Sequence, residues 1–114
     1  MSPINATFAE YVVNDLLSGI ENCRYKSMFG GFGVYINGVM FGLIAYDELY
    51  FKVTKDNQAD YEKASSRPFI YTGHKNKKPV TMSYWLVPPS VMDDREQMKT
   101  WALKAYEAAL KLKK

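Results

Sequence analysis

The chain contains few of the residues that build covalent or metal-based sites. It has one cysteine and one histidine, so Cys23 has no partner for an internal disulfide and His74 cannot form a histidine cluster. Zinc sites draw three or four ligands from such residues. These counts argue against metal catalysis and against a cysteine–histidine nucleophile, and we expect no metal and no cofactor.

Long apolar runs are also missing. No stretch approaches the ~20 residues that cross a bilayer, and no basic segment followed by an apolar core opens the chain as in a secretory signal. We therefore expect a cytoplasmic protein without a membrane partner. The composition is otherwise globular, with 47% hydrophobic and 24% charged residues. Its 114 residues suit one domain over residues 1–114, with no second domain.

Helical patterns stand near both ends of the chain. Apolar residues recur at helical spacing up to Ile20, where Gly19 favours a stop, and Thr7 with Glu10 fits a capping box. Near the C-terminus, Asp93 or Asp94 can cap a second helix. The apolar face that we predict for this second helix consists of Met98, Trp101, Ala102, Ala105, Ala109 and Leu112.

Strands are predicted between these helices. Asn37-Gly38 separates two apolar runs and is a strong hairpin signal, because both turn residues need a positive φ. The following strand should run to about Tyr46 and turn at Asp47-Glu48. Further along we predict a strand over 49–53, a short helix over 58–64, strands over 68–72 and 80–87, and a loop over 73–79. This order predicts an α+β fold, a two-layer sandwich with N- and C-terminal helices packed on an antiparallel sheet.

One glycine-rich run invites comparison with phosphate-binding loops. It reads Met28-Phe29-Gly30-Gly31-Phe32-Gly33. A phosphate loop must open a helix, whose N-terminus receives the phosphate, whereas this run leads into a strand. We interpret it as a bulge or tight bend where another backbone or an aromatic ring packs closely.

Two surfaces are candidates for binding a partner. Residues 67–80 carry four basic groups and no acidic one, and the candidates for phosphate contact there are Arg67, Lys75, Lys77 and Lys78. Nucleic-acid binding through them would be weak, blind to sequence and salt-sensitive, and an ordinary solvated loop explains the same residues. The last helix also has a second apolar stripe of Leu103, Tyr106 and Leu110. This stripe either packs on the N-terminal helix or serves a protein partner or a homodimer mate.

Enzymatic chemistry is the least favoured class, because no catalytic residue can be named. Arg24 and Lys26 would favour a Cys23 thiolate, although we interpret Cys23 as a small packing residue. A small-ligand pocket near Phe29, Phe32 and Tyr50 is a further hypothesis.

At a set of scattered residues the chain resembles a known family. They are Met28, Phe29, Gly30, Gly31, Gly33, Gly38, Phe41, Leu49, Tyr50, Lys52, Met82, Tyr84, Pro88, Trp101 and Ala105. With these residues the chain is similar to the N-terminal domain of the TfoX/Sxy family of bacterial competence regulators, from about residue 8 to about residue 110. We interpret the motif residues as structural.

The resemblance implies a two-layer domain with flanking helices and a regulatory role in the transcription of competence genes. It implies no catalytic residues. We therefore expect a non-enzymatic regulatory or adaptor domain, here standing alone, that contacts a protein such as the transcription machinery or an activator. The alternative is a weak, sequence-nonspecific nucleic-acid-binding accessory protein that uses the basic residues 67–78.

Overall fold

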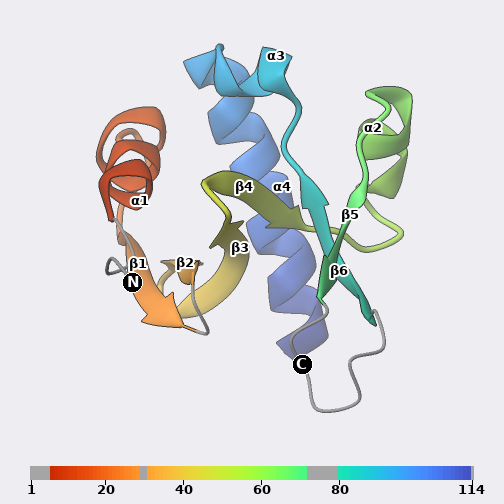
Figure 1. Cartoon of the computed structure of the whole chain (residues 1–114), viewed down its shortest axis with the longest axis horizontal. Helices are drawn as coiled ribbons and strands as arrows, with labels where there is room; N and C mark the ends of the chain where they lie inside the picture. Colours follow the sequence, from red (N-terminus) through yellow and green to blue (C-terminus); the bar gives the residue numbers. More distant parts are fainter. Residues whose placement is uncertain (1–5, 29–30, 72–79, 114) are drawn as a thin grey trace.

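The sheet at the centre of the molecule is antiparallel throughout. A computed structural model describes residues 6–28, 31–71 and 80–113. Within these residues six strands pair in the order β1-β2-β3-β4-β6-β5 (Figure 1). The strands are β1 (Cys23–Met28), β2 (Gly31–Ile36), β3 (Val39–Ala45), β4 (Glu48–Lys52), β5 (Pro68–Tyr71) and β6 (Val80–Leu86). The helical segments are α1 (Thr7–Tyr11), the π-helical η1 (Val12–Leu16), α2 (Gln58–Lys63), α3 (Pro89–Met92) and α4 (Arg95–Lys113).

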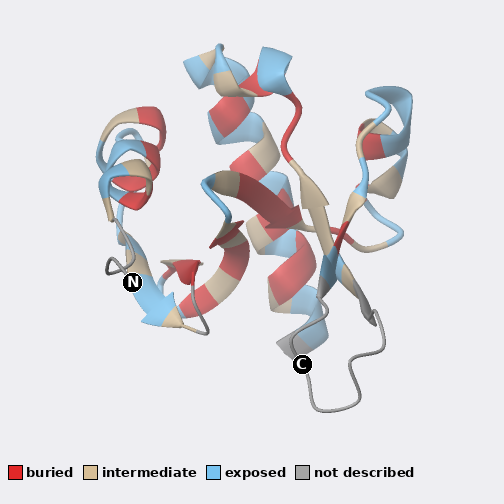
Figure 2. Cartoon of the chain, viewed as in Figure 1, coloured by how far each residue is buried: buried red, intermediate tan, exposed pale blue. Residues whose placement is uncertain are grey.

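Helices cover one face of this sheet. The long helix α4 runs behind the central strands in Figure 1 and packs on β3 and β4, while η1 contacts both α4 and β1. Alternate strand residues point into this layer, as Phe32, Val34 and Ile36 of β2 do. Figure 2 shows the buried residues on the central strands and on the side of α4 that faces them. The predicted α+β, two-layer architecture is confirmed.

The two tight turns of the meander β2–β3–β4 use backbone conformations of the same kind. Asn37 and Gly38 have φ values of 51° and 79°, as predicted for the hairpin between β2 and β3. The next turn was predicted at Asp47-Glu48, but Ala45 pairs with Glu48, so Tyr46 and Asp47 form the turn. Their φ values are 54° and 59°. No glycine marks this turn, and a bulky residue such as Tyr46 rarely adopts a positive φ. The conformational preferences of the residues therefore predicted the turn one residue further along the chain.

The helix cap predicted near the C-terminus is confirmed, and the one predicted near the N-terminus is not. Asp94 caps α4, because its Oδ1 accepts hydrogen bonds from the backbone N–H groups of Glu96 (3.0 Å) and Gln97 (3.2 Å). The capping box predicted near the N-terminus is wrong, since Ala6 is the N-cap and Thr7 is the first helical residue. The Glu10 carboxylate instead accepts a hydrogen bond from the Tyr25 hydroxyl (3.4 Å).

Three further features of the helices differ from the prediction. The N-terminal helical segment ends at Leu16, before the predicted end near Ile20. The short helix α3 was not predicted, because Pro88-Pro89 signals the end of a strand; proline is equally suited to the first turn of a helix, where Pro89 lies. On α4, Leu112 is 61% exposed rather than part of the core. The last turn of α4 lies at the lower end of the molecule in Figure 1, away from the buried centre.

Candidate functional site

An apolar hollow of about 540 Å³ lies on the face of the sheet that α4 does not cover. Leu49 and Phe51 of β4 belong to the core beneath α4, so Tyr50 between them faces the other way. Leu43 pairs with Tyr50 across the β3–β4 ladder and therefore shares this open face. The hollow is lined chiefly by the side chains of Met28, Met40, Leu43, Phe69, Met82 and Tyr84.

Strands from both halves of the sheet form the walls of the hollow. Leu43 lies on β3, while Phe69 and Tyr84 lie on the β5–β6 hairpin. The Phe69 ring meets the Tyr50 ring of β4 edge-on, with centroids 5.0 Å apart. Since β5 and β4 are separated by β6, the two rings meet over the intervening strand, in a sheet that is strongly twisted and curled (Figure 1). The curl turns a flat surface into a concave one.

Glycines of β2 permit the close packing at one side of the hollow. A Cβ added to Gly31 would lie 2.2 Å from the carbonyl oxygen of Ile44, so no side chain fits there. A Cβ on Gly33 would lie 2.9 Å from the sulfur of Met28 and 3.0 Å from the Tyr35 ring. The close backbone and aromatic packing expected of the glycine run is confirmed for these two positions, whereas the irregularity in the pairing of β2 with β3 lies between Val34 and Tyr35 and not at the glycines. Phe29 and Gly30 lie outside the described residues.

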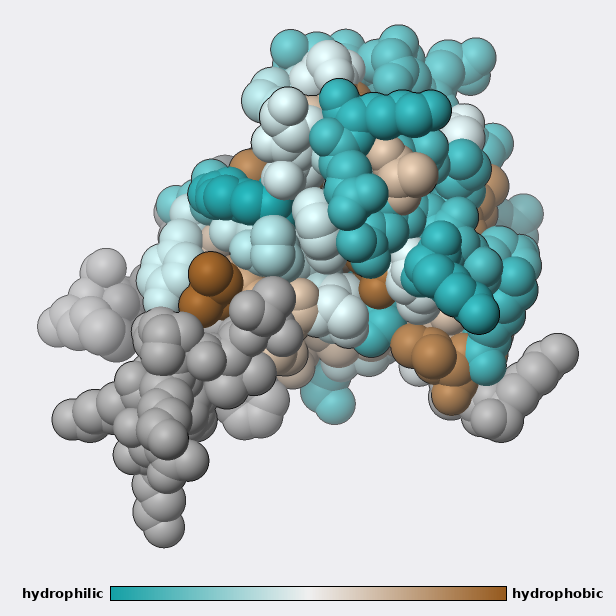
Figure 3. Space-filling model, turned by 90° about the vertical axis from the view of Figure 1, so that its right-hand side faces the viewer, coloured by the Kyte–Doolittle hydropathy of each residue, from teal (hydrophilic) through white to brown (hydrophobic). Residues whose placement is uncertain are grey.

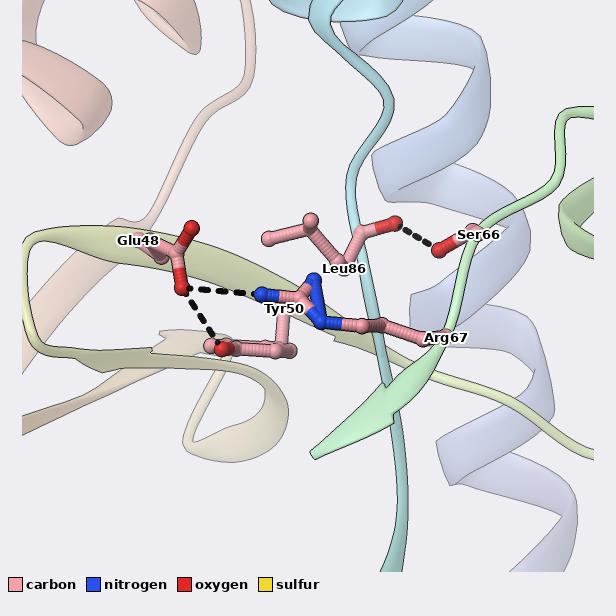
Figure 4. Close-up of polar contacts among 5 residues, drawn as sticks. All are labelled: Glu48, Tyr50, Ser66, Arg67 and Leu86. Carbon is pink, nitrogen blue, oxygen red and sulfur yellow. Dashed lines mark hydrogen bonds and ion pairs between the residues drawn. The ribbon is translucent and has the colours of Figure 1, made fainter. Parts of the chain in front are cut away.

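A polar cluster borders the hollow at the start of β4. The Tyr50 hydroxyl donates a hydrogen bond to Oε1 of Glu48 (2.9 Å), and Nη2 of Arg67 lies 3.5 Å from the same oxygen (Figure 4). Beside them Ser66 donates a hydrogen bond to the Leu86 carbonyl, which ties the chain entering β5 to β6. Burial, with the Glu48 hydrogen bond next, raises the pKa of Tyr50 to about 12. The cluster is therefore a neutral tyrosine beside an ion pair.

Lys52 lies at the opposite end of β4. Its ammonium is 5.1 Å from the centroid of the Tyr84 ring and donates a hydrogen bond to the Ser83 hydroxyl (2.6 Å). None of the carboxylates in the described part of the chain forms an ion pair with it. Partial burial lowers the pKa of Lys52 from its ordinary value. Lys52 is therefore a cation without a carboxylate partner among the described residues. It adjoins the hollow because the Tyr84 ring that it contacts lines the hollow.

The candidate phosphate-binding residues are only partly described. Arg67 forms the ion pair with Glu48 and is exposed. Lys75, Lys77 and Lys78 lie outside the described residues. An exposed ion pair of this kind contributes little to stability, but it partly neutralises the one cation of the group whose position is known.

The second stripe of α4 does not form one exposed apolar surface. Leu103 is 37% exposed, whereas Tyr106 and Leu110 are half-buried and pack against the core. The Tyr106 hydroxyl also accepts a hydrogen bond from the Asn37 amide (3.2 Å), at the β2–β3 turn. Leu103 alone therefore remains available to a partner at this place.

The motif residues fall into two structural groups. One group supports the fold: Phe41, Leu49, Pro88 and Ala105 are buried, Trp101 packs on Tyr61, and Gly38 forms the hairpin turn. The other group lines or adjoins the hollow: Met28, Gly31, Gly33, Tyr50, Lys52, Met82 and Tyr84. The second group thus contributes to a potential binding surface as well as to packing.

Several lining residues were not singled out from the sequence. Met40, Leu43 and Phe69 follow ordinary strand patterns, and only the curl of the sheet brings them together. Of the residues near which a pocket was predicted, Tyr50 adjoins the hollow through Phe69, whereas Phe32 faces the helix layer and packs edge-on against Tyr25; Phe29 lies outside the described residues. Tyr50 is 4% exposed beneath Phe69.

Neither a cluster of metal ligands nor an activated thiol is found among the described side chains. Within residues 6–28, 31–71 and 80–113, no three potential ligands of the His, Cys, Asp and Glu types gather to hold a metal ion. Burial raises the pKa of Cys23 to about 11, which opposes the thiolate that Arg24 and Lys26 were expected to favour.

Among the helices of the described segments, none has the length and apolar character needed to cross a bilayer.

The hollow also differs from the rest of the described surface in its apolar character. Elsewhere the large exposed apolar side chains occur singly, as at Tyr11, Ile70 and Leu103, which is ordinary for a folded domain. The side of the molecule that carries α2 and β5 is mostly hydrophilic, with small separate apolar groups (Figure 3).

Comparison with known proteins adds one match. A family model described as the TfoX N-terminal domain matches residues 15–109. No curated protein matches the chain.

Proposed function

Because the chain belongs to the TfoX N-terminal domain family, we propose that it is a non-enzymatic regulatory or adaptor domain that contacts a protein partner in the cytoplasm. The partner that suits a competence-regulator family is the transcription machinery or an activator. The observation that supports this proposal most directly is the apolar hollow on the open sheet face, which gathers methionine and aromatic side chains.

The composition of the hollow suits recognition of another molecule. Three of its lining residues are methionines, Met28, Met40 and Met82, and their flexible thioether side chains adapt to different apolar shapes. Tyr46 borders the hollow and is 84% exposed, so its ring is free to pack on an incoming surface. A partner that inserts an apolar side chain would bury these groups and gain affinity from the area removed from water.

A pair of matched variants tests where a partner binds. Met82→Glu places a carboxylate in the hollow, and Leu103→Glu places one on the outer side of α4. After affinity capture from host extract and identification of the partner, its affinity for each purified variant is measured by calorimetry. We expect at least a tenfold loss for Met82→Glu and little change for Leu103→Glu, with native circular dichroism for both. The reverse result would place the contact on α4, and the absence of any saturable partner would count against the proposal.

The alternative function, weak nucleic-acid binding through residues 67–78, has less support from the described residues. Arg67 is paired with Glu48. Fluorescence anisotropy of labelled duplex DNA at about 50 and 200 mM salt separates the two functions, since each phosphate contact contributes about −0.9 to the salt slope. We expect no binding at either salt concentration. Binding that weakens steeply between them would favour the nucleic-acid function.

A further inference from the structure

The hollow has the size and lining of a small-molecule site. Its volume of about 540 Å³ falls within the range of roughly 300–1,000 Å³ found for ligand pockets. The walls are apolar on both sides, with Leu43 and Met40 from β3 facing Phe69 and Tyr84 from the β5–β6 hairpin. An aromatic ring or a short alkyl chain therefore fits this site in both size and polarity.

The charges at the two ends of β4 are not balanced in the same way. At the start of the strand, the Glu48 carboxylate is paired with Arg67 and accepts a hydrogen bond from Tyr50. At its end, Lys52 contacts only the neutral Ser83 hydroxyl and the face of the Tyr84 ring among its described partners. Tyr84 lines the hollow. The site thus offers an apolar cavity with one uncompensated positive charge at its border.

We infer that the hollow binds a small amphipathic carboxylate, with the apolar body between Leu43 and Phe69 and the carboxylate on the Lys52 ammonium. A carboxylate supplies the negative charge that no described residue provides, and an ammonium–carboxylate hydrogen bond is stronger than the hydroxyl contact that Lys52 now makes. The inference goes beyond the proposed function, because a small ligand can occupy the cavity whether or not a protein partner contacts the same face.

Simple probes test both parts of this ligand. Decanoate carries an apolar chain and a carboxylate, decyltrimethylammonium carries a similar chain with the opposite charge, and acetate carries the carboxylate alone. We expect decanoate to bind at least tenfold more tightly than decyltrimethylammonium, and acetate to show no saturable binding in calorimetric titrations. Equal binding of the two chain-bearing probes would overturn the assignment of the charge.

Three variants test the role of Lys52. Lys52→Met keeps the apolar stem and removes the charge, Lys52→Arg keeps the charge, and Lys63→Met removes an exposed charge on α2 as the matched control. We expect Lys52→Met to weaken decanoate binding about tenfold or more, as for loss of a charged hydrogen bond, and the other two variants to bind within about threefold of the natural chain. Undiminished binding by Lys52→Met would refute the role of this residue.

The methionines report where the probe binds. Met28, Met40 and Met82 line the hollow, while Met98 is a buried residue of α4 and Met92 lies on α3. In methyl NMR spectra, decanoate should shift the three hollow signals and leave the other two nearly unchanged. Shifts centred on Met92 or Met98 would show that decanoate binds outside the hollow and would overturn the assigned site. Shifts of the hollow signals on raising the protein concentration alone would instead show a second copy as the occupant and overturn the ligand assignment.

Discussion

Gly31→Ala offers the most direct test of how the hollow is built. The added Cβ would lie 2.2 Å from the carbonyl oxygen of Ile44 and 3.3 Å from its carbonyl carbon. The first contact is about 1 Å shorter than ordinary van der Waals packing allows. Because the contacted atom belongs to the main chain of β3, a rotamer change cannot relieve the overlap. Strands β2 and β3 must move apart where Phe32 pairs with Ile44.

The size of the effect follows from this geometry. Overpacking costs about 1–3 kcal/mol and occasionally more, and a clash with rigid main chain belongs at the upper end. We therefore expect Gly31→Ala to lower the free energy of unfolding by about 3 kcal/mol or more, a large share of the roughly 5–15 kcal/mol typical of a domain. Urea unfolding followed by the fluorescence of the half-buried Trp85 and Trp101 measures this loss.

Other glycines supply graded controls. Gly38→Ala meets no atom within 4 Å but must keep a φ of +79°, so we expect a cost of about 1–2 kcal/mol. At Gly19 the nearest contact is 3.9 Å, from Nζ of Lys99, and the change to alanine should be nearly neutral. Gly33→Ala should fall between Gly38→Ala and Gly31→Ala, since the Met28 side chain can move. A loss below about 1 kcal/mol for Gly31→Ala, or one no larger than that of Gly38→Ala, would refute the reasoning.

Three other predictions concern single side chains. Tyr61→Phe should leave stability unchanged or raise it by about 1 kcal/mol in urea unfolding, because the buried Tyr61 hydroxyl has no hydrogen-bond partner among the described residues; a clear loss would reveal a partner. Cys23, with its pKa raised by burial from 9.0 to about 11, should react with iodoacetamide at pH 8 roughly a hundredfold more slowly in the folded chain than in urea, and equal rates would contradict this. Hydrogen bonds from the Gln97 side chain and backbone lower the pKa of Asp94 below its ordinary 3.8. The stabilisation by Asp94 is therefore complete above that pH and lost as the pH falls through the lower folded value. The stability difference between the natural chain and Asp94→Ala should shrink on acidification, and a constant difference down to pH 2 would contradict the assignment.

Local sequence signals predicted those elements whose cause is local. Asn37-Gly38 specifies its turn because both residues tolerate a positive φ, and Asp94 caps α4 through its own side chain. The turn at Tyr46 and Asp47 was displaced by one residue in the prediction, because the β3–β4 register rather than residue preference sets it. Here the pairing of two strands outweighs the conformational cost at Tyr46.

The candidate site was only partly predictable for the same reason. Met28, Lys52, Met82 and Tyr84 were singled out through the family resemblance, but nothing in their spacing places them on one concave face. Their proximity depends on the curl of the sheet and on the insertion of β6 between β4 and β5. Such long-range geometry is absent from any short window of sequence.

The insertion of β6 has a mechanical consequence. Strands β1 to β4 form a meander of consecutive hairpins, and the β5–β6 hairpin joins it through three residue pairs, Tyr50 with Leu86, Phe51 with Trp85, and Lys52 with Tyr84. The walls of the hollow lie on either side of these three residue pairs. A molecule that contacts both walls at once would therefore link the β5–β6 hairpin to the meander in addition to these three pairs. Because Phe69 of the edge strand β5 is part of one wall, occupancy of the hollow would bear directly on how firmly this edge strand is held.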